Sequence, residues 1–302
     1  MTASHGLTLL VDAPSLVYRA YFSTPDTVRA SDGRGVNAVH GFFGMLARLI
    51  ADHDPARIAC AADVNWRPEW RVALVESYKR HRTEAGSVQQ TADAALAEQV
   101  PIAFELLARV GVVVAGHPEY EAEDVIGTLA ARTEGPVAIV SGDRDLFQLV
   151  RDPDVYVLYP RRGVSVLDRV DEAYIAQRYG IPPRAYRDYA VLRGDASDGL
   201  PGVRGIGEKI AASLLTRYGS LDDVVAAARE DPVRSAALGK VRRELDYVER
   251  AARVVTIATD VPLPTVDLTR PRPAPDDALR ARAAELGLAG ALARLVNALR
   301  RP

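Results

Sequence analysis

The sequence predicts an α/β protein with a mainly parallel β-sheet flanked by helices, followed by a second, helical domain. Two observations predict this. Strand-length apolar runs alternate with helical patterns as far as about residue 170, and they are continuously apolar, as is typical of parallel strands covered on both faces. Beyond that point the strand-like runs stop, and helical segments separated by Gly and Pro follow. We therefore expect an α/β domain over residues 1–170 and a helical domain over residues 171–302.

Each expected strand is a short apolar run. In chain order they are LTLLV (7–11), RIACAA (57–62), VVVA (112–115), PVAIV (136–140) and DVYVLY (154–159). The segment 36–50 has Val39, Phe43 and Leu46 on one helical face, and the helical pattern over 103–111 ends on a glycine suited to a C-cap. The Pro-rich segment 269–277 is expected to link the helical domain to a last helical stretch.

The overall composition is that of an ordinary globular protein. The chain has 302 residues, of which 48% are hydrophobic and 26% charged, and no apolar run approaches the length of a membrane helix. The N-terminus resembles no signal peptide, so we expect a cytoplasmic protein without a membrane partner. The single cysteine, Cys60, is expected to be a buried apolar residue. The net charge of -2 decides nothing about nucleic-acid binding.

Acidic residues follow three of the expected strands at the point where each strand ends. The carboxyl ends of parallel strands meet at one edge of a sheet, the edge that holds ligands in open α/β folds. The helix that begins near residue 121 opens at the same edge, and a further acidic pair lies at the junction with the helical domain. The acids are Asp12, Asp63, Glu121, Glu123, Asp124, Asp143, Asp145, Asp195 and Asp198.

Nine carboxylates at one edge would repel one another, by about 1 kcal/mol per close pair in water and about 4 kcal/mol near a protein surface. The neighbouring strand-end positions hold Ala, Ser and Gly rather than basic residues, apart from Arg144. Any single acid is most simply a turn or cap residue, but the set favours bound Mg²⁺ or Mn²⁺. Such a site can hold two ions about 4 Å apart, an arrangement suited to cleaving phosphodiester bonds.

A glycine-rich string, GLPGVRGIGEKIAASLL, spans residues 199–215. Gly202, Gly205 and Gly207 allow close approach of the backbone, the following helix start exposes N–H groups, and Lys209 adds positive charge. The string resembles the helix-hairpin-helix class, which holds duplex DNA by its backbone without reading sequence. A plain glycine-rich turn is the simpler alternative. A mononucleotide P-loop is excluded because the GK[ST] ending is absent.

The segment NWRPEWRVALVESYKRHR, residues 65–82, interleaves aromatic and basic residues. It holds both tryptophans of the chain, Trp66 and Trp70. Rings that alternate with cations suit single-stranded nucleic acid, through base stacking and phosphate contacts. An amphipathic helix with a solvated basic face explains the pattern equally well. Its place directly after Asp63 predicts a basic segment that overhangs the acidic edge.

Together these strings resemble the 5′-nuclease family, which comprises the 5′-3′ exonuclease domain of bacterial DNA polymerase I and the related flap endonucleases. The resemblance rests on LLVDAPSLVYRAYF, AADVNWRPEWR, YKRHR, YEAEDVIGTLA, SGDRDLFQLV, GDASDGLPGVRGIGEKIA and ELGLAGAL, which cover nearly the whole chain. It implies a PIN-like nuclease core with a basic arch over residues 65–100, and a helical DNA-binding domain with a helix-hairpin-helix motif. We expect a stand-alone, monomeric nuclease for DNA replication and repair.

The resemblance also implies roles for individual residues. The family's metal-binding acids correspond to the same nine carboxylates that the strand-end argument gathers. Its arch residues that handle the scissile phosphate correspond to Arg71 and Lys79. Those expected to bind DNA are Tyr18, Arg19, Arg82, Gly202, Gly205, Gly207 and Lys209. The implied cofactors are two or more Mg²⁺ or Mn²⁺ ions, with room for K⁺ at the hairpin.

Two positions depart from the family pattern. Glu123 stands where the family more often has Asp, and Ala13 follows Asp12 where Gly is common. The longer side chain at position 123 puts the rate and the metal preference in question more than the activity itself.

Two other functions are compatible with parts of the sequence. A non-catalytic module that holds junction DNA would have the same hairpin motif, but it would not need the complete acid set. A small-molecule phosphatase could use the two acids of GDRDL, yet Leu146 stands where such enzymes carry Thr or Val. That function also leaves the hairpin motif unused. The expected activity is therefore cleavage of DNA at junctions of duplex and single strand, such as 5′ flaps and nicks.

Overall fold

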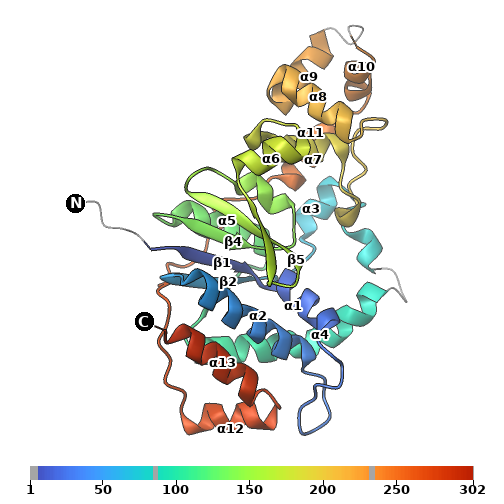
Figure 1. Ribbon diagram of the computed structural model, residues 1–302. Helices are drawn as coiled ribbons and strands as arrows, with labels where there is room; N and C mark the ends of the chain where they lie inside the picture. Colours follow the sequence, from blue (N-terminus) through green and yellow to red (C-terminus); the bar gives the residue numbers. More distant parts are fainter. Residues whose placement is uncertain (1–5, 84–87, 231–234, 302) are drawn as a thin grey trace, which may run out of the picture.

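The computed structural model describes residues 6–83, 88–230 and 235–301, and within them one mixed β-sheet organises the fold (Figure 1). The strand order is β3-β2-β1-β4-β5-β6; the first five are parallel and β6 runs antiparallel to β5. The strands are β1 (Thr8–Asp12), β2 (Arg57–Ala62), β3 (Val113–Gly116), β4 (Val137–Val140), β5 (Val155–Arg162) and β6 (Val166–Val170). The predicted α/β class and all five predicted strands are confirmed.

The sixth strand, β6, is absent from the sequence prediction. It lies at the edge of the sheet, and its residues mix apolar and charged side chains, with Val166 48% exposed. An edge strand needs neither a continuous apolar run nor burial on both faces. The pattern that reveals the central strands therefore misses β6.

Helices cover both faces of the sheet and form the rest of the molecule. They are α1 (Ala13–Ser23), α2 (Asn37–His53), α3 (Glu69–Leu74), α4 (Val88–Arg109), α5 (Ala122–Arg132), α6 (Glu172–Tyr179), α7 (Tyr186–Arg193), α8 (Glu208–Tyr218), α9 (Leu221–Glu230), α10 (Ala236–Arg243), α11 (Leu245–Val255), α12 (Asp277–Glu285) and α13 (Ala289–Leu299). The basic segment after Asp63 forms α3 and the short 3₁₀ helix η1 (Arg80–Thr83). No helix of the described residues combines the length and apolar character that crossing a membrane requires.

The two faces of the sheet bury separate cores. Leu9 and Val11 of β1 point to the face covered by α1, α2, α4 and α13. Leu10 points to the other face, where α5 packs and where the core continues into α7, α8 and α11. This alternation follows from the period of two along a strand. Because one core runs from the sheet into the helical domain, the two parts are held against each other.

The last two helices, α12 and α13, pack against the sheet domain and not against the helical domain. After α11 the chain runs back as an extended segment, residues 256–276, along the sheet domain (Figure 1). There Ile58 N–H donates to the Leu268 carbonyl (2.8 Å) and Arg270 N–H to that of Ala56 (2.9 Å). Helices α12 and α13 then pack on the face that holds α2. The sequence assigned residues 171–302 to one helical domain, whereas the structure packs 277–299 with the sheet domain.

Candidate active site

The acids meet where the parallel strands end. Val11 of β1 lies opposite Cys60 of β2 and Val140 of β4, so the residues that follow these positions share one edge. Ser141 Oγ donates to Asp12 Oδ2 and accepts from Asp143 N–H (2.8 Å). The N–H of Ser15 donates to Asp12 Oδ1 (3.2 Å). The buried Ser141 hydroxyl thus ties together the ends of β1 and β4, a role that no pattern in the sequence announces.

Four carboxylates at this edge form no ion pair with a basic side chain among the described residues. Within the described residues, no ion pair joins a Lys, Arg or His nitrogen to Asp12, Asp63, Asp143 or Asp145. Asp12 and Asp145 are buried, and Asp63 accepts a hydrogen bond from Ala122 N–H (2.7 Å). Unpaired charges in such places are costly. A bound cation would therefore stabilise these four carboxylates more than the acids that already form ion pairs.

The pKa values of Asp12 and Asp145 are raised. Burial, with the charges of Asp143 and Asp63, raises the pKa of Asp12 to about 7, although the Ser141 hydroxyl opposes the shift. Burial and the neighbouring charges of Asp143, Asp198 and Asp195 raise the pKa of Asp145 well above its ordinary range. These mutual influences mean that acids from separate strands and from the domain junction lie within electrostatic reach of one another.

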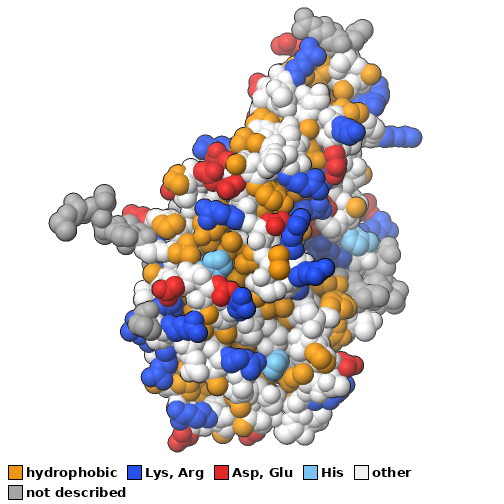
Figure 2. Space-filling model, viewed as in Figure 1, with side chains coloured by type: hydrophobic (Ala, Val, Ile, Leu, Met, Phe, Trp, Pro, Cys, Tyr) orange, Lys and Arg blue, Asp and Glu red, His pale blue; other side chains and the backbone are white. Residues whose placement is uncertain are grey.

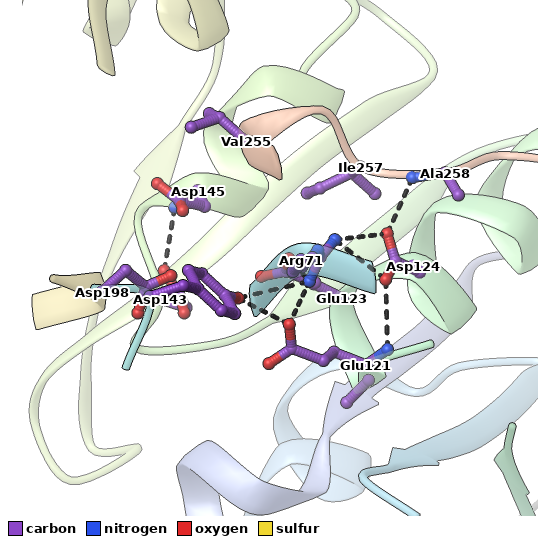
Figure 3. Close-up of polar contacts among 12 residues, drawn as sticks. Arg71, Glu121, Glu123, Asp124, Asp143, Asp145, Asp198, Val255, Ile257 and Ala258 are labelled. Carbon is purple, nitrogen blue, oxygen red and sulfur yellow. Dashed lines mark hydrogen bonds and ion pairs between the residues drawn. The ribbon is translucent and has the colours of Figure 1, made fainter. Parts of the chain in front are cut away.

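A second group of acids surrounds Arg71 (Figure 3). The guanidinium, which is fully buried, contacts both carboxylate oxygens of Asp124 (2.9 and 3.0 Å) and Glu123 Oε1 (2.7 Å). It also pairs with Glu121, which accepts from the hydroxyl of the buried Tyr78 (2.6 Å). In Figure 3 the trio Asp143, Asp145 and Asp198 lies beside this cluster. The nine acids therefore divide into a paired group and an unpaired group.

Lys79 lies between two parts of the acid set. Its buried ammonium pairs with Glu121 and lies 4.0 Å from Asp198 Oδ1. Although burial opposes it, the positive charges of Lys79 and Arg71 hold the pKa of Glu121 below its ordinary value. The backbone of Lys79 has φ of 49°, and its N–H donates to the Asp198 carbonyl (2.8 Å). A non-glycine residue in this strained region is typical of functional sites.

The expectation that only metal ions could relieve the repulsion needs correction. Arg71 and Lys79 come from outside the strands and neutralise the acids at the start of α5. Asp195 pairs with Arg193 (3.0 Å) and Asp198 with Arg82 (2.9 Å). Among the described residues, no three His, Cys, Asp or Glu side chains stand ready to hold a metal ion.

Two predicted DNA-binding residues, Tyr18 and Arg19, lie on α1. Arg19 Nε is buried without a hydrogen-bond partner, and a Cβ added at Gly142 would come within 3.1 Å of Arg19 Nη2. The guanidinium thus lies beside the loop that carries Asp143, without a carboxylate partner among the described residues. Tyr18 stacks against Phe22 (4.9 Å between ring centres), which is 54% exposed.

The glycine-rich string forms the turn that leads into α8 and the first part of that helix. Gly202 and Gly205 have φ of 69° and 80°, and a Cβ at Gly202 would lie 2.4 Å from the Arg193 carbonyl. Lys209 is exposed at the start of α8. Lys240 of α10 also reaches the turn, because its Nζ donates to the Gly205 carbonyl (2.8 Å). The sequence prediction missed Lys240, which lies far from the motif along the chain.

One face of the molecule carries basic side chains along both domains. Figure 2 shows Lys and Arg over the helical part and over the sheet part, with fewer acidic groups between them. An open cleft of about 690 Å³ lies between the two, lined by Arg144, Arg193, Asp195 and the start of α8. The lining of this cleft therefore carries two arginines, Arg144 and Arg193, and two acidic residues, Asp195 and Glu208.

Comparison with known proteins agrees with this arrangement. A family model described as the N-terminal, resolvase-like domain of 5′-3′ exonucleases matches residues 7–180. A second, described as their C-terminal SAM fold, matches residues 181–278. Together they span most of the chain.

Individual relatives and structures agree with the family models. A protein named 5′-3′ exonuclease from Streptomyces coelicolor is 46% identical, over 96% of this chain and 99% of its own. One from Mycobacterium tuberculosis is 43% identical, over 96% and 97%. The flap endonuclease of bacteriophage T5, solved with DNA and metal ions, shares the fold at a TM-score of 0.69 and 15% identity, over 98% and 100%. The chain belongs to the 5′-3′ exonuclease family.

Proposed function

We propose that the protein is a structure-specific 5′-3′ exonuclease and 5′-flap endonuclease that hydrolyses DNA phosphodiester bonds with divalent metal ions, in DNA replication and repair. One observation carries the proposal: Asp12, Asp63, Asp143 and Asp145 lie within electrostatic reach of one another at the sheet edge, and among the described residues none of them forms an ion pair with a basic side chain. Their oxygens are not preassembled around an ion, so these side chains would have to close on the metal when it binds. Membership of the 5′-3′ exonuclease family supports it.

The donor set of these four residues fits hard divalent cations. It consists of carboxylate oxygens, which Mg²⁺ and Mn²⁺ prefer, and it has no thiolate and no imidazole. Asp198 lies within electrostatic reach of Asp143, but Arg82 already contacts its Oδ1, so an ion would have to bind through Oδ2. Glu123 and Asp195 fit less well, because Arg71 and Arg193 already use their oxygens. Bound ions would supply positive charge to the scissile phosphate and acidify water near it.

The basic residues of the site have separate tasks in this proposal. Arg19, whose guanidinium has no carboxylate partner among the described residues, would contact a phosphate beside the Asp143 loop. Lys79 would turn from Glu121 toward the scissile phosphate when DNA enters, because a phosphate competes with the carboxylate for the ammonium. Arg82 holds the Ser197 carbonyl (2.8 Å) and Asp198, which keeps the domain junction closed.

The proposed substrate is DNA with a junction of duplex and single strand. The turn between α7 and α8, with Gly202, Gly205, Gly207 and Lys209, would hold the duplex backbone, and K⁺ is a candidate ligand there. The aromatic and basic segment after Asp63 would face the single strand. Structural neighbours crystallised with DNA support this assignment. A monomeric, cytoplasmic enzyme remains the prediction from the sequence.

Cleavage of a labelled 5′-flap substrate tests the proposal. We expect Asp143→Asn and Asp145→Asn to abolish Mg²⁺-dependent cleavage and to leave DNA binding in place. Asp277→Asn, on the exposed start of α12, is the matched control that keeps full activity. Full activity in the double variant Asp143→Asn/Asp145→Asn would reject the metal assignment. Binding without product in the unmodified protein with Mg²⁺ would favour the non-catalytic module.

A further inference from the structure

The carboxylate of Asp124 is already saturated by protein donors. Its Oδ1 accepts from Arg71 Nη2 (2.9 Å) and from Ala258 N–H (2.8 Å). Its Oδ2 accepts from the same Arg71 nitrogen (3.0 Å) and from Glu121 N–H (3.1 Å). The side chain has no exposed surface. A carboxylate has about four acceptor positions, and here each is used.

We infer that Asp124, which the sequence groups with the metal-binding acids, is a positioning residue and not a metal ligand in this protein. The set Arg71, Glu121, Asp124 and Ala258 is called here the Arg71 junction. A divalent ion could reach Asp124 only by displacing the Arg71 nitrogen that contacts both of its oxygens, together with two backbone donors. Breaking such a buried ion pair is unfavourable, because it removes one of the three carboxylates that neutralise Arg71 in the interior.

The Arg71 junction joins three parts of the molecule that are distant in sequence. Arg71 belongs to α3, at the base of the basic segment; Asp124 lies in the first turn of α5; and Ala258 follows α11. The third part is the segment by which the chain leaves the helical domain. Figure 3 shows the backbone nitrogen of Ala258, next to Ile257 in this segment, hydrogen-bonded to Asp124. One buried carboxylate therefore links the basic segment to the exit of the helical domain.

The segment after α11 is built to lie close to α5. A Cβ added at Gly127 would lie 2.6 Å from the Ala258 carbonyl oxygen and from Ile257 Cγ2. At the next residue, Thr128 Oγ1 accepts from Val261 N–H (3.0 Å), and further along α5 Arg132 donates to the Val261 carbonyl (2.7 Å). Gly127 thus permits the contact that brings Ala258 N–H onto Asp124.

This arrangement also positions Lys79. Arg71 and Tyr78 fix Glu121, and Glu121 in turn holds the Lys79 ammonium. Loss of the Arg71 junction would make the position of Lys79 less fixed. It would leave the unpaired acids Asp12, Asp63, Asp143 and Asp145 in place. This consequence rests on the proposed function, because it matters only if Lys79 acts on DNA.

The first test measures direct binding of Mn²⁺ to the DNA-free protein by electron paramagnetic resonance. We expect Asp124→Asn to change the Mn²⁺ dissociation constant by less than about twofold, and Asp143→Asn to raise it at least about tenfold. A loss in Asp124→Asn as large as that in Asp143→Asn would overturn the inference. No loss in Asp143→Asn would instead reject the metal site of the proposed function.

The second test leaves every charge in place. Gly127→Ala pushes the segment after α11 away from α5, while Gly44→Ala adds a methyl group to a helix where nothing lies within 4 Å. We expect Gly127→Ala to speed amide hydrogen exchange over residues 257–261 at least tenfold and to lower kcat for a flap substrate more than it raises KM. Mn²⁺ affinity should not change. Gly44→Ala should leave all three unchanged.

The exchange experiment also covers the case in which Asp124→Asn does not fold. If residues 257–261 exchange their amide hydrogens at the same rate in Gly127→Ala and in the unmodified protein, the segment does not depend on this contact. That result would reject the positioning role of Asp124. A weakened Mn²⁺ affinity in Gly127→Ala would equally contradict a junction that is separate from the metal-binding acids.

Discussion

The ammonium group of Lys79 pairs with Glu121, and the same residue donates its backbone N–H to the Asp198 carbonyl at 2.8 Å. Through these two contacts one residue in a strained backbone conformation contacts the start of α5 and the turn between α7 and α8. Both the position and the charge of Lys79 are therefore set by the assembled fold.

Replacing Lys79 tests its role in catalysis. We expect Lys79→Ala to slow flap cleavage by about 100-fold or more, close to 3 kcal/mol in the barrier, because a preorganised cation near the reacting phosphate is lost. Arg48→Ala is the control, since Arg48 lies on α2 outside the basic segment and its side chain is 58% exposed. Single-turnover cleavage at saturating enzyme measures the step. Equal rates in Lys79→Ala and Arg48→Ala would contradict the role.

The stability of the metal-free protein should fall as the pH rises from about 4 to about 7. Burial raises the pKa of Asp12 from its ordinary 3.8 to about 7, so within this window the folded protein holds a proton that the unfolded chain has released. Each unit of such a shift corresponds to about 1.4 kcal/mol. Asp198, with its pKa raised to about 6 mainly by burial, acts in the same direction.

Denaturant unfolding of the protein and of Asp12→Asn, in EDTA at pH 5 and pH 8, isolates the contribution of Asp12. The variant cannot titrate at this position, so its stability relative to the unmodified protein should increase with pH. If the difference in unfolding free energy between the two proteins is the same at both pH values, the pKa of Asp12 is not raised in the folded protein.

Gly202, one of the positive-φ glycines of the hairpin turn, should not tolerate a side chain. Gly202→Ala places a Cβ 2.4 Å from the Arg193 carbonyl at a φ of 69°. We expect it to lower the free energy of unfolding by about 2 kcal/mol or more and to weaken binding of duplex DNA. Gly207→Ala meets nothing within 4 Å and serves as the control for stability. Thermal unfolding distinguishes them, and equal losses at both positions would contradict the steric argument.

Arg19 should contribute one phosphate contact. We expect Arg19→Ala to weaken flap binding and to reduce the slope of log affinity against log salt concentration by about 0.9, the value for one contact with duplex DNA. Arg48→Ala is a matched control, because Arg48 is exposed on α2 and pairs with Asp52 (2.5 Å). Fluorescence anisotropy over a range of salt concentrations measures both slopes. An unchanged slope in Arg19→Ala would place the residue outside the DNA interface.

Much of the sheet could be predicted because its central strands are covered on both faces. Their continuous apolar runs identify β1, β2 and β4, and the order of the chain then places Asp12, Asp63 and Asp143 at one edge. The family resemblance supplied the same acids independently. The strand β6 was not predicted, because it lies at the edge of the sheet and mixes apolar and charged residues.

The roles of the buried polar residues could not be predicted. Arg71 was expected to meet the scissile phosphate, but the structure buries it completely among three carboxylates. Asp124 was expected to hold a metal ion, yet its oxygens are used by Arg71, Ala258 and Glu121. No local pattern distinguishes a carboxylate that faces solvent from one that faces a guanidinium fifty-three positions away.

The amino-acid sequence by itself determined the α/β class, the edge at which the acids gather and the hairpin turn, because these depend on short-range periodicity and on residues that follow strands directly. Only the tertiary structure decided which acids are paired, that α12 and α13 return to the sheet domain, and that Ala258 binds Asp124. Ion pairs and backbone donors are contributed by segments far apart in the chain. Which groups pair is therefore decided by how these segments pack, and no single segment of the sequence specifies that packing.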